Sequence, residues 1–102
     1  MTELNLRHLA LSTEIIEKYR LGRVSYPKLV SRLEETLFSL ESPPQDWFTQ
    51  VSEKWEHLET INALILGSDD PRKEQAKFKS KIDNLLGALT DLVCNYPLKS
   101  GS

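Results

Sequence analysis

Apolar side chains recur every three or four residues in four blocks of this sequence, the spacing of one face of an α-helix. The blocks cover approximately residues 2–21, 26–41, 45–66 and 71–96. No segment shows the residue-by-residue alternation typical of a strand. Helices joined by such short turns run antiparallel to their neighbours, so the sequence predicts an all-α fold, an antiparallel up-down four-helix bundle. We expect one domain over residues 1–97 and a disordered tail at 98–102.

Turn-forming residues mark the breaks between the blocks. Gly22 follows the first block and is expected to take the left-handed conformation that often ends a helix. Ser25 then offers an N-cap, with Pro27 in the first turn of the second helix. Asp70 and Pro71 are expected to open the fourth helix in the same way. The breaks therefore support the helix boundaries that the apolar spacing predicts.

The break before the third helix contains two prolines, in the stretch Ser42-Pro43-Pro44-Gln45. This stretch predicts a capping box, in which the Ser42 hydroxyl bonds forward and the Gln45 side chain reaches back. Both prolines are tolerated in a first helical turn. We therefore expect the second and third helices to be joined almost without a loop, with Gly67 ending the third.

The apolar faces of the four blocks predict the core. They consist of Leu4, Leu11, Ile15, Ile16 and Tyr19 in the first helix; Leu29, Val30, Leu33, Leu37 and Leu40 in the second; Trp47, Val51, Trp55, Leu58 and Ile65 in the third; and Phe78, Ile82, Leu85, Leu89, Leu92 and Tyr96 in the fourth. Asn62 also points inward by this count and needs a hydrogen-bond partner, either a backbone carbonyl or Tyr19. Because these faces can close on one another, we expect a monomer, or at most a weak dimer, when no partner is bound.

Composition and motifs argue against several classes of function. A single cysteine, Cys94, suits a reducing compartment, so we expect a cytoplasmic protein. No apolar run is long enough to cross a bilayer, and the start of the chain lacks the basic region of a secretory signal. Phosphate-loop, dinucleotide and nucleophile-elbow motifs are absent, and the two histidines, His8 and His57, lie far apart. We therefore predict no enzyme activity, no cofactor and no metal site.

Charge is distributed unevenly along the chain. Residues 34–70 carry nine acidic side chains and one basic side chain, a net charge of −8, whereas residues 1–33 and 71–102 each carry +3. Solvated helix faces are the ordinary explanation of such a run. Its one-sidedness instead favours a surface that attracts a basic partner. A basic cluster between Arg72 and Lys81 has no such explanation, and with a pI near 5.7 and little aromatic interleaving it does not predict nucleic-acid binding.

The second and third helices place this acidic charge on their outer sides. Phe38 falls almost opposite Leu33 on the second helix, among carboxylates, and it either packs under another helix or is an exposed apolar anchor. On the third helix the tryptophans face inward and the carboxylates outward. The predicted partner-binding surface consists of Glu34, Glu35, Phe38, Glu41, Asp46, Glu53 and Glu56.

The segments RLGRVSYPKLVSRLEETLFSL (20–40) and DWFTQVSEKWEHLETINALIL (46–66) resemble a known family. They are similar to the small helical immunity proteins of contact-dependent growth inhibition systems in Gram-negative bacteria. The matching positions are Gly22, Tyr26, Pro27, Leu29, Val30, Arg32, Leu33, Glu34, Trp47, Trp55, Leu58, Glu59 and Ala63. The resemblance implies a cytoplasmic protein that binds a cognate toxin domain, often a nuclease, and blocks its active site.

Two other classes of function remain open on the sequence alone. The same acidic face would serve a helical adaptor or regulatory subunit that binds a basic protein. A small structural subunit of an enzyme is the other alternative. Protection of cells against a toxin encoded beside the gene distinguishes an immunity protein from both.

Overall fold

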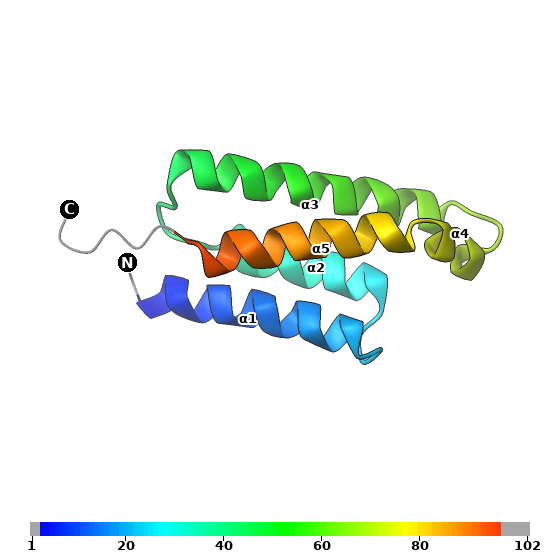
Figure 1. The fold of residues 1–102 in the computed structure, drawn as a ribbon, viewed down its shortest axis with the longest axis horizontal. Coiled ribbons are helices and arrows are strands. Elements are labelled where there is room, and N and C mark those ends of the chain that lie inside the picture. Colours follow the sequence, from blue (N-terminus) through cyan, green and yellow to red (C-terminus); the bar gives the residue numbers. More distant parts are fainter. Residues whose placement is uncertain (1–2, 97–102) are drawn as a thin grey trace.

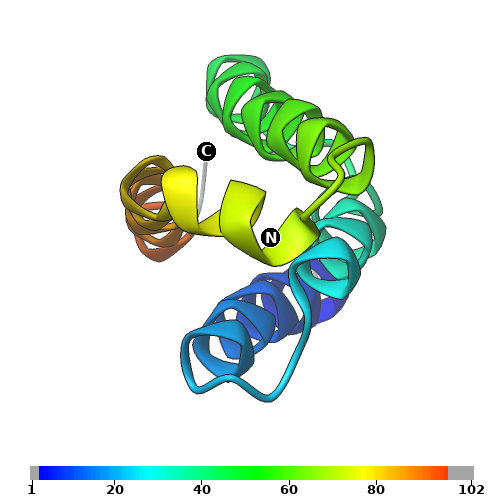
Figure 2. The same cartoon turned by 90° about the vertical axis from the view of Figure 1, so that its right-hand side faces the viewer.

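The computed structural model describes residues 3–96, which form five α-helices and no strand. The helices are α1 (Glu3–Arg20), α2 (Tyr26–Leu37), α3 (Gln45–Leu66), α4 (Pro71–Lys77) and α5 (Lys79–Cys94). The four longer helices lie side by side in alternating directions, and the short α4 lies across the end of the molecule where α1 turns into α2 (Figures 1 and 2). The all-α prediction is confirmed for these residues, but the four-helix bundle is not, because there are five helices. The tail predicted at 98–102 lies outside the described residues.

The fifth helix arises from a break at Phe78, within the stretch predicted as one helix. The Phe78 backbone has φ −95° and ψ 5°. Its N–H donates to the carbonyl of Gln75, three residues back (3.1 Å), and its carbonyl accepts from Ile82 to begin α5 (2.8 Å). A bond to the third residue back tightens the chain and ends the regular helix. No proline or glycine marks this position, so the apolar spacing runs through it without a signal.

Most of the predicted helix ends are found in the structure. Gly22 has φ +76°, the left-handed conformation that an L-residue adopts at a cost. The Ser25 hydroxyl accepts a hydrogen bond from the Lys28 N–H (3.4 Å), and an Asp70 carboxylate oxygen accepts one from Lys73 (3.3 Å). Prolines occupy the first turns of both α2 and α4, as expected.

The capping box predicted at Ser42–Gln45 is wrong. α2 ends at Leu37, residues 38–44 form a loop, and Pro44 is the N-cap of α3 without any side-chain cap. Ser42 takes φ +45°, so it turns the chain instead of capping the helix. The loop is fixed to α1, because the Asn5 side chain forms two hydrogen bonds with the backbone of Glu41.

The core lies between the four longer helices. Its buried apolar residues are Leu9, Ile16, Tyr26, Leu29, Val30, Leu33, Leu37, Trp47, Val51, Leu58, Ile61, Ile65, Ile82, Leu86, Leu89 and Val93. The face predicted for α2 is confirmed for Leu29, Val30, Leu33 and Leu37, whereas Leu40 lies in the following loop and is partly buried. Trp55 is only half-buried, and its indole N–H donates to the Val30 carbonyl (3.0 Å).

The face predicted for the first helix is partly wrong. Leu4 and Leu11 are each 42% exposed, whereas Asn5 and Ser12 are buried beside Leu9 and Ile16. The Ser12 hydroxyl donates to the Leu9 carbonyl (2.7 Å), and Asn5 is paired with the loop before α3. Because a hydrogen-bonded polar group can be buried at little cost, apolar spacing alone selects the wrong side of this helix.

Candidate functional site

All seven residues of the predicted partner-binding surface are exposed, but they do not form one patch. Glu35 lies in a groove between α1 and α2, while Glu53 and Glu56 lie in a groove between α3 and α5. Viewed along the helices, the α1–α2 and α3–α5 pairs occupy opposite sides of the molecule (Figure 2). The structure therefore brings Glu53 and Glu56 together and separates Glu35 from them.

Phe38 lies at a third place, on the seam between α2 and α3. It is 39% exposed, and its ring packs against Phe48 (5.5 Å between ring centroids) and edge-on against Trp55 (5.1 Å). The residue is therefore both a packing residue and a partly exposed aromatic surface. Glu34, one turn earlier on α2, shares this side of the helix because residues four apart lie on one face.

The groove between α1 and α2 has mixed charge. Beside Glu35 it contains Glu14, Lys18, Lys28 and Arg32, and Lys18 forms an ion pair with Glu14 (3.2 Å). Three cations against two carboxylates give this groove no acidic character. Glu35 thus shares its groove with Lys28 and Arg32 of its own helix and with Lys18 of α1, and only the contribution of α1 lies beyond sequence reasoning on α2 alone.

The groove between α3 and α5 combines acidic and apolar groups in a volume of about 350 Å³. Its lining residues are Glu53, Glu56, His57, Thr60, Ile61, Leu64, Phe78 and Lys81. Leu64 is 51% exposed and Phe78 is partly buried, so the groove has an apolar surface open to solvent. Carboxylates beside exposed apolar groups suit a protein segment that is both basic and apolar.

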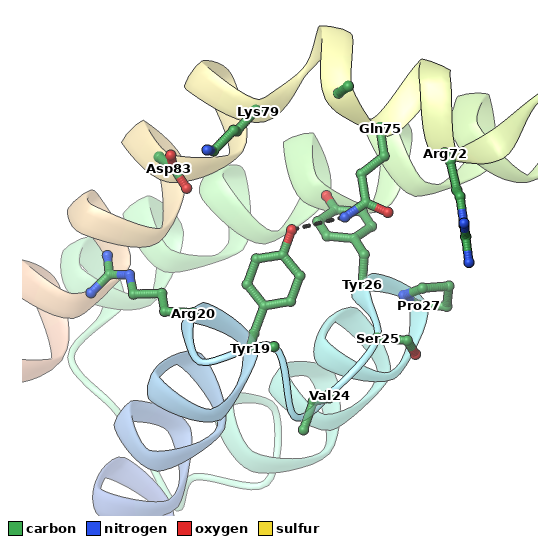
Figure 3. Close-up of a pocket in the computed structure, with 12 residues that line it drawn as sticks. Tyr19, Arg20, Val24, Ser25, Tyr26, Pro27, Arg72, Gln75, Lys79 and Asp83 are labelled. Atoms are coloured by element: carbon green, nitrogen blue, oxygen red, sulfur yellow. Dashed lines mark hydrogen bonds between the residues drawn. The ribbon is translucent and has the colours of Figure 1, made fainter.

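A cavity larger than either groove, with a volume of about 770 Å³, lies at the end of the molecule covered by α4 (Figure 3). It is lined by Tyr19, Arg20, Gly22, Val24, Ser25, Tyr26, Pro27, Arg72, Gln75, Ala76, Lys79 and Asp83. The sequence did not predict this cavity, because it forms only where the break at Phe78 turns α4 across the α1–α2 turn. Its only sequence signal is the otherwise unexplained basic cluster that begins at Arg72.

Two unpaired polar atoms are buried elsewhere in the described residues. Asn62 Oδ1 and His8 Nδ1 have no hydrogen-bond partner there. Of the two partners expected for Asn62, a backbone carbonyl or Tyr19, the Tyr19 hydroxyl accepts from Gln75 and does not donate to Asn62 Oδ1. Across residues 3–96, no three histidine, cysteine, aspartate or glutamate side chains gather as metal ligands would. Cys94 is exposed.

No protein-family model matches the chain, and comparisons with curated proteins and with solved structures give no match either. The resemblance to immunity proteins therefore rests on the residues of α2 and α3 described above. Among the described helices, none has both the length and the apolar character needed to cross a membrane.

Proposed function

We propose that this protein is an immunity protein, a binding protein without enzyme activity that neutralises a cognate toxin domain in the bacterial cytoplasm. We further propose that the toxin domain, a basic nuclease, docks on the groove between α3 and α5. The observation that carries this proposal is the placement of Glu53 and Glu56 beside the exposed Leu64 and the partly buried Phe78. This groove places carboxylates beside an apolar group, but that group is Leu64 and not Phe38, the apolar anchor expected from the sequence.

Electrostatics supports a basic partner. The −8 net charge of residues 34–70 lies on α2, α3 and their flanking loops, and Asp46 adds a further exposed carboxylate at the start of α3. Nuclease active sites are electropositive because they hold phosphates, so an acidic inhibitor surface attracts them and accelerates association. Lys81 leaves the groove itself only weakly negative, so the surrounding α3 carboxylates contribute to steering.

The resemblance to immunity proteins supports the fold more than the contact surface. Tyr26, Leu33, Trp47 and Leu58 are buried, and Gly22 forms the turn before α2. Tyr26 joins α2 to α3 through its bond to the Leu58 carbonyl, whereas Trp47 joins α3 to α5 by donating to the Leu92 carbonyl. The partner surface would then lie on exposed positions around them, which vary more freely than a core.

Co-expression with the toxin domain encoded beside the gene tests the proposal. We expect the wild-type protein to restore growth, and growth arrest in its presence would rule out immunity. An adaptor or a structural subunit would give no protection. Because the partner is supplied directly, this assay separates immunity from the other two classes of function.

Charge reversal then tests the choice of surface. Glu53→Lys with Glu56→Lys should slow association several-fold, and the effect should shrink at high salt because exposed charges are screened beyond about 8 Å at physiological ionic strength. Glu34→Lys with Glu35→Lys applies the same charge change on α2, away from the groove, and should have a smaller effect. If the α2 pair weakens binding and the α3 pair does not, the toxin domain docks on the α2 side instead.

A further inference from the structure

The cavity beneath α4 has a construction that the proposed immunity function does not use. Three separate segments build it: the end of α1, the turn into α2, and the α4–α5 stretch on either side of Phe78 (Figure 3). A hydrogen bond joins two of them, since Gln75 Nε2 of α4 donates to the Tyr19 hydroxyl of α1 (3.1 Å). The volume of the cavity, about 770 Å³, lies within the range of roughly 300–1,000 Å³ typical of small-molecule sites.

The charged residues of this cavity are mainly basic. Its charged lining residues are Arg20, Arg72, Lys79 and one carboxylate, Asp83, a local net charge of +2 in a protein whose total is −2. None of these three cations forms an ion pair within residues 3–96. Figure 3 shows Arg20, Lys79 and Asp83 on one side of Tyr19 and Arg72 on the other. Cations without partners around one cavity suit an oxyanion, which arginine binds through paired N–H groups.

The two tyrosines add an aromatic wall and one free donor. Tyr26 is committed, because its hydroxyl donates to the Leu58 carbonyl (2.7 Å). The Tyr19 hydroxyl accepts from Gln75, and its own proton has no acceptor among the described residues. A tyrosine hydroxyl is already protonated at neutral pH and burial raises the pKa of Tyr19 further, so this hydroxyl can donate. The two rings meet edge-on at 5.9 Å, and Val24, Pro27 and Ala76 extend the apolar lining.

We propose that this cavity binds a small aromatic anion, a ligand in which an oxyanion group is attached directly to an aromatic ring. The ring would lie against Tyr19 and the apolar lining, and the exposed side chains of Lys79 and Arg72 would close from either side of Tyr19 onto the anionic oxygens, with the Tyr19 hydroxyl as a further donor. This site is separate from the α3–α5 groove, so a ligand here and a protein partner there do not compete for the same residues.

Titration of the isotope-labelled full chain with phenyl phosphate, followed by amide NMR shifts, tests this inference. We expect shifts concentrated in residues 19–27 and 72–79. Inorganic phosphate has only the anionic group and benzyl alcohol only the aromatic ring, so both should bind more weakly than phenyl phosphate. Arg72→Gln and Lys79→Gln should each weaken phenyl phosphate binding roughly tenfold, as loss of one charge-assisted contact does. Tyr19→Phe keeps the ring and should weaken binding several-fold.

Lys73→Gln and Lys81→Gln are the matched controls, since they remove the same charge from neighbouring positions that do not line the cavity. Both should leave the affinity unchanged. If Lys73→Gln weakens binding as much as Arg72→Gln, the attraction is diffuse and the cavity is not the site. If inorganic phosphate binds as tightly as phenyl phosphate, the aromatic part of the proposal is overturned. Absence of shifts in residues 19–27 and 72–79 at millimolar phenyl phosphate would overturn it entirely.

Discussion

The side chain of Asn5 pairs with the backbone of Glu41 through two hydrogen bonds. Asn5 Nδ2 donates to the Glu41 carbonyl (2.9 Å), and the Glu41 N–H donates to Asn5 Oδ1 (2.8 Å). Asn5 is 2% exposed and Glu41 is exposed, so this polar pair is partly buried. It fixes the loop between α2 and α3 to the start of α1, and it replaces the capping box that the sequence predicts there.

Replacing Asn5 should therefore destabilise the fold. We expect Asn5→Ala to lower the free energy of unfolding by about 1–3 kcal/mol, because it leaves the Glu41 backbone groups unpaired in a partly buried place. Asn84→Ala, at an exposed asparagine of α5, is the control and should change stability by about 0.5 kcal/mol or less. Urea unfolding measures both. Equal stability of the two variants would show that the Asn5 bonds contribute nothing.

Two glycines should respond to alanine in opposite directions. A Cβ at either Gly22 or Gly87 would meet no atom within 4 Å, so neither change is limited by space. Gly22 has φ +76°, where alanine costs about 1–2 kcal/mol. Gly87 lies inside α5, where alanine should add about 0.4–1 kcal/mol to the free energy of unfolding. Thermal unfolding of both variants should show shifts of opposite sign, and a common sign would contradict the assigned backbone conformations.

Tyr26 should make the protein sensitive to alkali. Burial raises its pKa, with smaller contributions from Tyr19 and Glu59, above the value of about 10 in an unfolded chain. Its contribution to stability is therefore complete below about pH 10 and is lost as the pH rises through the folded value, at up to about 1.4 kcal/mol per pH unit.

The test compares wild type with Tyr26→Phe. At pH 8 the variant should be about 1 kcal/mol less stable, since it loses the bond to the Leu58 carbonyl. Near pH 11 this difference in stability should vanish or reverse. The wild type loses stability there because Tyr26 ionises more readily in the unfolded chain, whereas phenylalanine does not ionise. Urea unfolding at both pH values measures it. A difference that stays constant would show that the Tyr26 hydroxyl titrates alike in the folded and unfolded chain.

Phe38 should contribute to stability even before a partner binds. Its ring contacts Phe48 and Trp55, so Phe38→Ala should lower the free energy of unfolding by about 1–2 kcal/mol and alter the near-ultraviolet signal of Trp55. Phe38→Leu retains apolar volume and should lose about half as much. If Phe38→Ala leaves both stability and the tryptophan signal unchanged, the ring does not pack on α3 in solution.

Leu33 and Leu64 should separate stability from partner binding. Leu33 is fully buried, and Leu33→Ala should lower the free energy of unfolding by about 2–5 kcal/mol. Leu64 is exposed in the α3–α5 groove, so Leu64→Ala should change stability by about 0.5 kcal/mol or less. Under the proposed function, Leu64→Ala should speed toxin dissociation with little salt dependence, because it removes an apolar contact. Unchanged dissociation would remove Leu64 from the docking surface.

The α2 face and most helix ends could be predicted from the sequence because they depend on neighbouring residues. Leu29, Val30, Leu33 and Leu37 follow the helical period and are all buried, and Gly22 and Ser25 act through their own backbone and cap geometry. Such signals do not require knowledge of the rest of the fold. The exposure of the α3 carboxylates Glu53 and Glu56 could be predicted for the same reason, because it follows from the helical period.

Three features depended on contacts between distant residues. The buried side of α1 follows from the pairing of Asn5 with Glu41, 36 residues away. The break at Phe78 is accompanied by the bond between Gln75 and Tyr19, 56 residues apart, with no proline or glycine to mark it. The separation of Glu35 from Glu53 follows from which helices are neighbours. Periodicity along one helix contains none of this information.

The sequence by itself determined that the chain is helical, where most of its helices begin and end, and which side of α2 faces inward, because local spacing and capping chemistry govern these properties. Tertiary structure alone decided how the charges are grouped. It placed Glu53 and Glu56 beside Leu64 in one groove, and it turned α4 so that Arg72 and Lys79 share a cavity with Tyr19. Side chains from different helices form a site only after packing fixes the order and rotation of those helices.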